Sequence, residues 1–133
     1  MVLTNYLSKD ELASINREVV KISGDPHGVM NDANLTHLIE AICFKYEGDA
    51  DAIVLKAAFL LDYLANKGHV FIEGNKRTAT TATITFLSLN GLIFVEQDQA
   101  ELTGFILSVA RNEKSLTQIA KWLKQRIKSV GNE

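Results

Sequence analysis

The chain has 133 residues, of which 47% are hydrophobic and 23% charged, with a formal net charge of −2 at pH 7. This composition excludes a disordered chain, and the slight negative charge argues against a general nucleic-acid binder. The longest apolar run, Ala57–Leu61, is far too short for a membrane span, and polar residues stand where a signal peptide would have its apolar core. We therefore expect one domain over residues 1–133, located in the cytoplasm, with no direct contact to nucleic acid or membrane.

The N-terminal part of the chain predicts a helix followed by a loop. Ser8 and Glu11 have the spacing of a capping box, and apolar residues then repeat at helical spacing to about Ser23. The segment that follows contains the only proline and two glycines, a composition typical of a loop.

Two further helices are expected in the middle of the chain. The first is capped by Asn34 or Asp32 and ends at Gly48. The second, Ala52–Leu64, is apolar on almost every side and is predicted to be buried. Gly68 is expected to end this second helix as a left-handed C-cap, because only glycine adopts that conformation without a steric cost.

The C-terminal half predicts three more helices. One begins at Asn75, a second is capped by Asp98, and the last is capped by Ser115 with Ile127 on its buried face. Between the first two, Leu92–Val95 is the one strand-like run, either a connector or half of a minor hairpin. About six helices joined by short loops predict an all-α bundle, in which two central buried helices present the loop between them.

The loop between the central helices, His69–Arg77, is the candidate functional site. A helix start has unpaired backbone N–H groups and a partial positive charge, and Gly74 lets the backbone approach a ligand closely, so phosphate is a favoured guest. Lys76 and Arg77 add two cations at a helix end where each is unfavourable by about 0.3–1 kcal/mol unless an anion offsets it. Such a broken local rule is typical of a functional site.

Two other side chains of this loop have the chemistry of phosphoryl transfer. His69 is able to take a proton near neutral pH, and Glu73 is able to hold a hard cation such as Mg²⁺. Taken singly, each has a simpler explanation: an isolated histidine is usually a surface or core residue, and a carboxylate before a helix stabilises its start. Their combination with a glycine turn and two cations within nine residues favours a phosphoryl-handling site.

These residues resemble the signature of the Fic/Doc family. That signature is His-x-Phe-x-[Asp/Glu]-[Gly/Ala]-Asn-[Gly/Lys]-Arg, and the chain matches it at every defined position with His69, Phe71, Glu73, Gly74, Asn75, Lys76 and Arg77. Family members that transfer nucleotidyl groups usually have Pro after the His, Gly before the Arg, and a second Arg three residues later. Here these positions hold Val70, Lys76 and Thr80, which indicates the Doc (death-on-curing) toxin branch.

The resemblance implies a base and a metal ligand. His69 would deprotonate the hydroxyl of a target protein, and Glu73 would hold Mg²⁺ on the phosphates of ATP or another nucleoside triphosphate. The segment Gly24–Asn31, called the flap loop below, would by its position line the cleft and hold the target chain. The mouth of the bundle is accordingly expected to be a cleft large enough for a nucleotide.

The resemblance also implies a phosphate site. Gly74, Asn75, Lys76 and Arg77 would bind the phosphates, and the last two would in addition stabilise the charge of the transition state. Phe71 is interpreted as structural, turning into the core to anchor the loop.

The function implied is that of a Doc-type toxin, a protein Ser/Thr kinase. It would transfer the γ-phosphoryl group to a Ser or Thr hydroxyl of a translation factor, elongation factor Tu by resemblance, and so arrest growth. A separately encoded antitoxin would bind the toxin and block its cleft. Two alternatives remain open: a Fic-type protein adenylyl or nucleotidyl transferase, and a catalytically silent binding domain with the same fold.

Overall fold

The computed structural model describes residues 3–96 and 98–130, and it confirms the all-α fold with six α-helices. The elements are α1 (Lys9–Lys21), α2 (Asp32–Phe44), α3 (Ala52–Asp62), the π-helical turn η1 (Tyr63–Lys67), α4 (Asn75–Leu89), β1 (Leu92–Phe94), α5 (Gln99–Ala110), α6 (Leu116–Lys124) and β2 (Ile127–Ser129). No helix in this described part of the chain is both long and apolar enough to cross a membrane.

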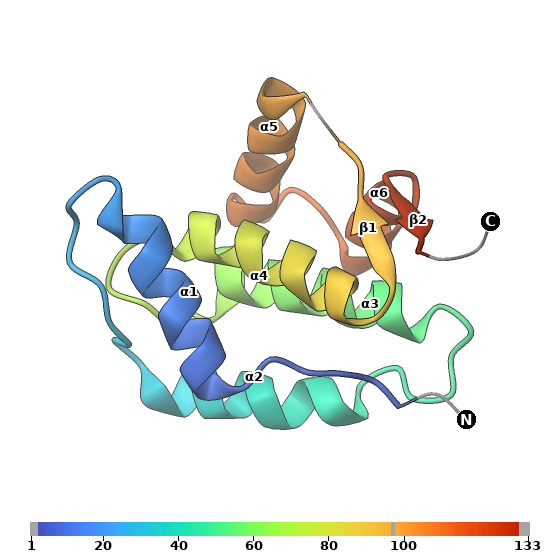
Figure 1. Ribbon diagram of the computed structural model, residues 1–133, viewed down its shortest axis with the longest axis horizontal. Coiled ribbons are helices and arrows are strands. Elements are labelled where there is room, and N and C mark those ends of the chain that lie inside the picture. Colours follow the sequence, from blue (N-terminus) through green and yellow to red (C-terminus); the bar gives the residue numbers. More distant parts are fainter. Residues whose placement is uncertain (1–2, 97, 131–133) are drawn as a thin grey trace.

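The central pair of helices is α3 and α4, as the sequence predicts. Figure 1 shows α3 behind α4 in the middle of the molecule, with α2 below the pair and α5 above it. The carboxyl end of α1 lies beside the amino end of α4 (Figure 1). The loop that joins the central pair therefore emerges at the left end of the bundle in Figure 1, on the same side as the flap loop and opposite β1 and β2.

Three helices begin at residues that the sequence marks as caps. Ser8 and Ser115 both form complete capping boxes, and the Asp98 carboxylate accepts hydrogen bonds from the first turn of α5. The prediction for α2 was wrong, because its cap is Asn31, whose side chain accepts a hydrogen bond from the Asn34 backbone N–H. Asn31 has the extended backbone that a cap requires, whereas Asn34 is already in the first turn.

The end of the first central helix also differs from the prediction. Gly68 has a φ of −83° and does not form a left-handed cap; the chain continues from α3 through η1, and the left-handed residue is His69, with a φ of +45°. Glycine is required at position 68 for another reason. A Cβ there would lie 2.6 Å from the ring of Tyr63, so a side chain has no room.

The strand-like run forms one half of a two-stranded antiparallel ribbon. Leu92 pairs with Ser129 and Phe94 with Ile127, so the partner is the C-terminal strand rather than a neighbouring hairpin strand. The prediction that Ile127 lies on the buried face of the last helix was wrong, because α6 ends at Lys124 and the chain turns there.

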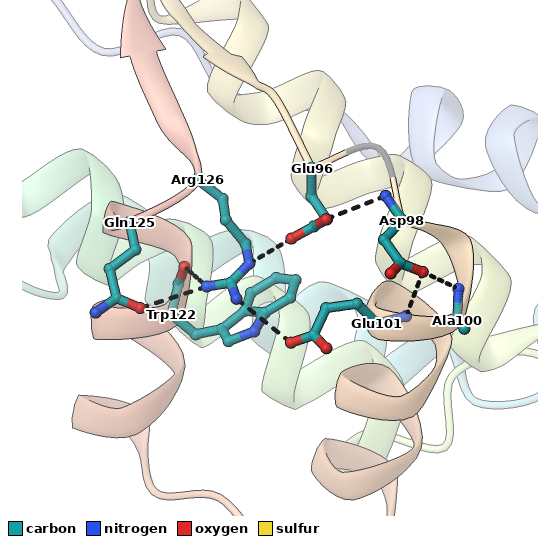
Figure 2. A network of polar contacts seen from close by, with 7 residues as sticks. All are labelled: Glu96, Asp98, Ala100, Glu101, Trp122, Gln125 and Arg126. Atoms are coloured by element: carbon teal, nitrogen blue, oxygen red, sulfur yellow. Dashed lines mark hydrogen bonds and ion pairs between the residues drawn. The ribbon is translucent and has the colours of Figure 1, made fainter.

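Arg126 makes this turn and joins three elements (Figure 2). Its guanidinium lies 4.3 Å from the centre of the Trp122 ring, its Nε donates to Glu96 Oε1 at 2.7 Å, and its backbone carbonyl accepts from Val95 at 2.7 Å. Hydrogen bonds from the Asp98 backbone N–H and from Arg126 lower the pKa of Glu96. This network fixes the connector before α5 against α6.

One buried cation interrupts the apolar surface of α3. Lys56 is fully buried, and its Nζ donates to the Ile42 carbonyl at 2.6 Å and pairs with Glu47 Oε1 at 2.8 Å. Burial acts to lower the pKa of Lys56, but the hydrogen bonds and charges of Glu47 and Tyr6 together outweigh it and raise that pKa. The ammonium thus satisfies a carbonyl at the carboxyl end of α2, where a cation is favoured, and ties α2 to α3.

Candidate active site

The flap loop pairs directly with the candidate site. The Val70 carbonyl accepts hydrogen bonds from the backbone N–H groups of Met30 (2.8 Å) and Asn31 (3.1 Å), and Ile72 donates to the Gly28 carbonyl at 3.0 Å. These strand-like contacts place the flap loop along the motif, where the resemblance to the Fic/Doc signature puts it.

Asn16 of α1 joins the flap loop to the motif, and the sequence analysis missed it. Its buried side-chain amide donates to the Glu73 carbonyl at 2.8 Å and to Thr78 Oγ1 at 3.1 Å, and it accepts from the Gly28 backbone N–H at 3.1 Å. An amide with three partners at zero exposure has no unpaired polar atom to penalise its burial. The available signal was its position four residues after Leu12, on the buried face of α1.

Phe71 and Asn75 set the shape of the motif loop. The Phe71 side chain is fully buried, which confirms its interpretation as the anchor of the loop. The Asn75 amide accepts from the Phe71 backbone N–H and donates to the Phe71 carbonyl, both at 3.0 Å. The Asn75 side chain therefore closes the loop on itself, and in this conformation a phosphate would meet the backbone of Asn75 rather than its amide.

Gly74 is the N-cap of α4 and lies against α1. Its φ is +78°, and a Cβ at this position would lie 2.4 Å from Cγ1 of Val20. The turn therefore needs glycine both for its left-handed backbone and for the close approach of α1. Asn75 is half-buried and Lys76 and Arg77 are exposed, so the first turn of α4 lies near the surface, and an anion is favoured at such a helix start.

The substitution Gly74→Ala is expected to destabilise the fold by about 1–3 kcal/mol, through left-handed strain and displacement of Val20. Gly91→Ala is the matched control, because Gly91 has a φ of +80° but no heavy atom within 4 Å of an added Cβ. Urea unfolding of both variants measures the difference. A cost for Gly74→Ala no larger than that for Gly91→Ala would show that the contact with Val20 is unimportant.

The charged motif residues differ in their surroundings. His69, Glu73 and Lys76 all have exposed side chains. Arg77 instead reaches the carboxyl end of α1, where its Nη1 donates to the Val19 carbonyl at 3.0 Å and its Nη2 lies 3.4 Å from Asp25 Oδ2. A cation is favoured at that end of a helix, so the charge of Arg77 is partly offset within the chain. Binding of phosphate by Lys76 and Arg77 stays a prediction.

A groove of about 410 Å³ lies between α1, α4 and α5, next to these two cations. Lys76 and Arg77 line it together with mostly apolar residues such as Ile22, Leu102 and Ile106. His69 and Glu73 are not among the residues that line this groove. This groove lies beside the two cations, and the joint action of His69, Lys76 and Arg77 on one polyphosphate stays a prediction.

Glu73 fits a magnesium ion that arrives with a nucleotide. In residues 3–96 and 98–130, no group of three or more His, Cys, Asp or Glu side chains is arranged to hold a metal by itself. Mg²⁺ in phosphoryl-transfer sites is usually bound by one or two carboxylates together with substrate phosphates and water. The Glu73 carboxylate is exposed, and Asn16 holds the backbone carbonyl of the same residue by a hydrogen bond. This carboxylate has the chemistry of such a single ligand.

Comparison with known proteins found two matches that span the motif loop. A sequence profile described as Fic/DOC family matches residues 6–87, a range that runs from before α1 almost to the end of α4. The chain is also 26% identical over 123 residues to the protein named protein kinase doc of Escherichia phage P1, covering 90% of this chain and 94% of that protein. Both matches include the motif loop and the flap loop.

Proposed function

The chain belongs to the Fic/Doc family, and from that membership we propose that it is a Doc-type toxin acting as a protein Ser/Thr kinase. It transfers the γ-phosphoryl group of ATP or another nucleoside triphosphate to a hydroxyl of a translation factor, elongation factor Tu by resemblance, and a separately encoded antitoxin restrains it. The observation that carries the proposal is a complete set of motif residues on a loop paired with the flap loop, in a chain related along its length to protein kinase doc.

His69 is proposed as the general base. Its imidazole is exposed, and the next residue, Val70, is bonded to the flap loop, so a target chain held by the flap loop would pass beside it. The hydroxyl oxygen of the target attacks the γ-phosphorus while its proton passes to the imidazole. The bond between the γ-phosphorus and the β–γ bridging oxygen breaks, and the nucleoside diphosphate leaves with that oxygen.

The phosphates are proposed to bind at the amino end of α4. The backbone N–H groups after Gly74 and the ammonium of Lys76 supply positive charge there, and phosphoryl transfer depends mainly on such positioning and charge stabilisation. Mg²⁺ on Glu73 would neutralise part of the phosphate charge when the nucleotide is bound. The buried Asn16 of α1 fixes the backbone of Glu73 by a hydrogen bond to its carbonyl.

The kinase proposal predicts which phosphorus atom reaches the target. With triphosphate labelled at the γ position, label is expected on purified elongation factor Tu; with the same nucleotide labelled at the α position, none is expected. The measurement is labelled protein after gel separation, with the His69→Ala variant as a blank. Label from the α position alone would show a nucleotidyl transferase, and label from neither position on any translation factor would favour a silent binding domain.

A further inference from the structure

His69 has an unusual backbone conformation for a catalytic base. Its φ of +45° lies in the left-handed region, where the Cβ of any residue other than glycine comes too close to the carbonyl oxygen of that residue. The motif loop therefore holds its proposed base in a strained conformation, and the surrounding residues must prevent it from relaxing.

Hydrogen bonds hold the peptide group before His69 and the backbone one residue after it. On the downstream side, the Val70 carbonyl accepts from two backbone N–H groups of the flap loop. On the upstream side, the Gly68 carbonyl accepts from Asn34 Nδ2 at 2.6 Å, and the Gly68 N–H donates to the Tyr63 carbonyl at 2.7 Å. Rotation about the N–Cα bond of His69 would have to break one of these sets.

Asn34 is itself fixed in place. Its backbone N–H donates to the Asn31 side chain at 3.0 Å, and its backbone carbonyl accepts from the Tyr63 hydroxyl at 2.9 Å. Tyr63 also accepts, through its own carbonyl, the hydrogen bond from Gly68. Hydrogen bonds thus connect the first turn of α2, the π-helical turn η1 and Gly68 to one another. Within this network, the Asn34 side chain is the donor to the peptide group before His69.

From this geometry we infer that Asn34 is a positioning residue for His69: its side-chain amide orients the Gly68–His69 peptide and keeps the imidazole directed outward beside the flap loop. The inference rests on the proposed function in one respect, that His69 is the base. Asn34 is 35 residues before His69 in the chain and outside the signature, so the motif alone gives no indication of this role.

The kinetic test uses Asn34→Ala, which removes the donor, and Asn34→Asp, which replaces it by an oxygen facing the Gly68 carbonyl. Both are expected to lower kcat for label transfer by about ten- to a hundredfold, because a displaced base is poorly aligned. The KM for the triphosphate is expected to stay unchanged, since the phosphate site belongs to α4.

Asn66→Ala is the matched control, because Asn66 is in η1 and loses a 3.0 Å hydrogen bond to Asn112 rather than to Gly68. An equal effect of Asn66→Ala, or a parallel change in kcat and KM, would overturn the inference.

A second test does not depend on activity. Glycine adopts the left-handed conformation freely, so His69→Gly is expected to lower the unfolding equilibrium constant by about two- to fivefold in the wild-type background. In the Asn34→Ala background the backbone is free to relax, and the same substitution should give no gain. Equal gains in both backgrounds would show that Asn34 does not hold His69. If the stability gained by His69→Gly differs between the two backgrounds but the wild-type protein transfers no label, the conformational role of Asn34 is supported and the proposed kinase activity is contradicted.

Discussion

The substitution His69→Ala is expected to lower the rate of γ-phosphoryl transfer by about 10²–10⁴-fold, the range that a general base contributes. The imidazole is the group that takes the proton from the target hydroxyl, and alanine leaves only water for that task. Because the His69 side chain is exposed, its removal takes no packing from the core, and the midpoint of urea unfolding should not fall. Initial rates with saturating triphosphate and target measure the effect.

The control for this experiment is His37→Ala. His37 is also an exposed histidine, on α2, with its ring 5.9 Å from that of Tyr63 and no bond to the motif loop. Its loss is expected to leave the rate within about twofold of wild type, in line with the small effects of most surface substitutions. Equal activity of the His69→Ala variant and the wild-type protein would contradict the assignment of the base.

Local patterns predicted those features whose physical causes are local. The caps Ser8, Asp98 and Ser115 form as expected because a side-chain oxygen and backbone N–H groups two or three residues later are enough to make them. The position of the motif loop was likewise predictable, because two long apolar segments flank it and must be buried.

The errors concern residues whose partners are distant in the chain. For Arg77 the sequence shows a cation at an unfavourable helix end but not the distant groups that help to offset its charge, the carboxyl end of α1 and Asp25, 52 residues away. Its role in binding phosphate stays a prediction. Gly68 was expected as a cap, whereas the Tyr63 ring beside it is the reason for glycine. Ile127 continued a helical pattern, yet it pairs with Phe94 in a ribbon that only the folded chain brings together.

Buried polar residues, in the site and elsewhere in the core, show the same limit more sharply. Asn16 and Lys56 lie within apolar faces of their helices, and the sequence gives no sign of what satisfies them. Their partners include the Glu73 and Ile42 carbonyls, which are backbone atoms and carry no residue-type signal. A motif identifies the groups that act on substrate, and the groups that position them become visible only from the fold.

The substitution Phe71→Ala is expected to destabilise the fold by about 3–5 kcal/mol, the usual cost of removing a buried aromatic side chain. Phe71 is fully buried in the core cluster and is the one fully buried aromatic side chain of the motif loop. Phe44→Ala is the matched control: that side chain is 78% exposed, and its loss should cost little. Urea unfolding of the two variants against wild type measures the difference.

The consequence for activity should follow the consequence for stability. Asn75 bonds the backbone of Phe71 and not its ring, so both hydrogen bonds can persist in the Phe71→Ala variant. At low temperature, where the variant is still folded, we therefore expect label transfer to be reduced less than in His69→Ala and to disappear on warming well below the wild-type unfolding temperature. If Phe71→Ala costs no more stability than Phe44→Ala, the motif loop is shaped by Asn75 and the flap loop without an aromatic anchor.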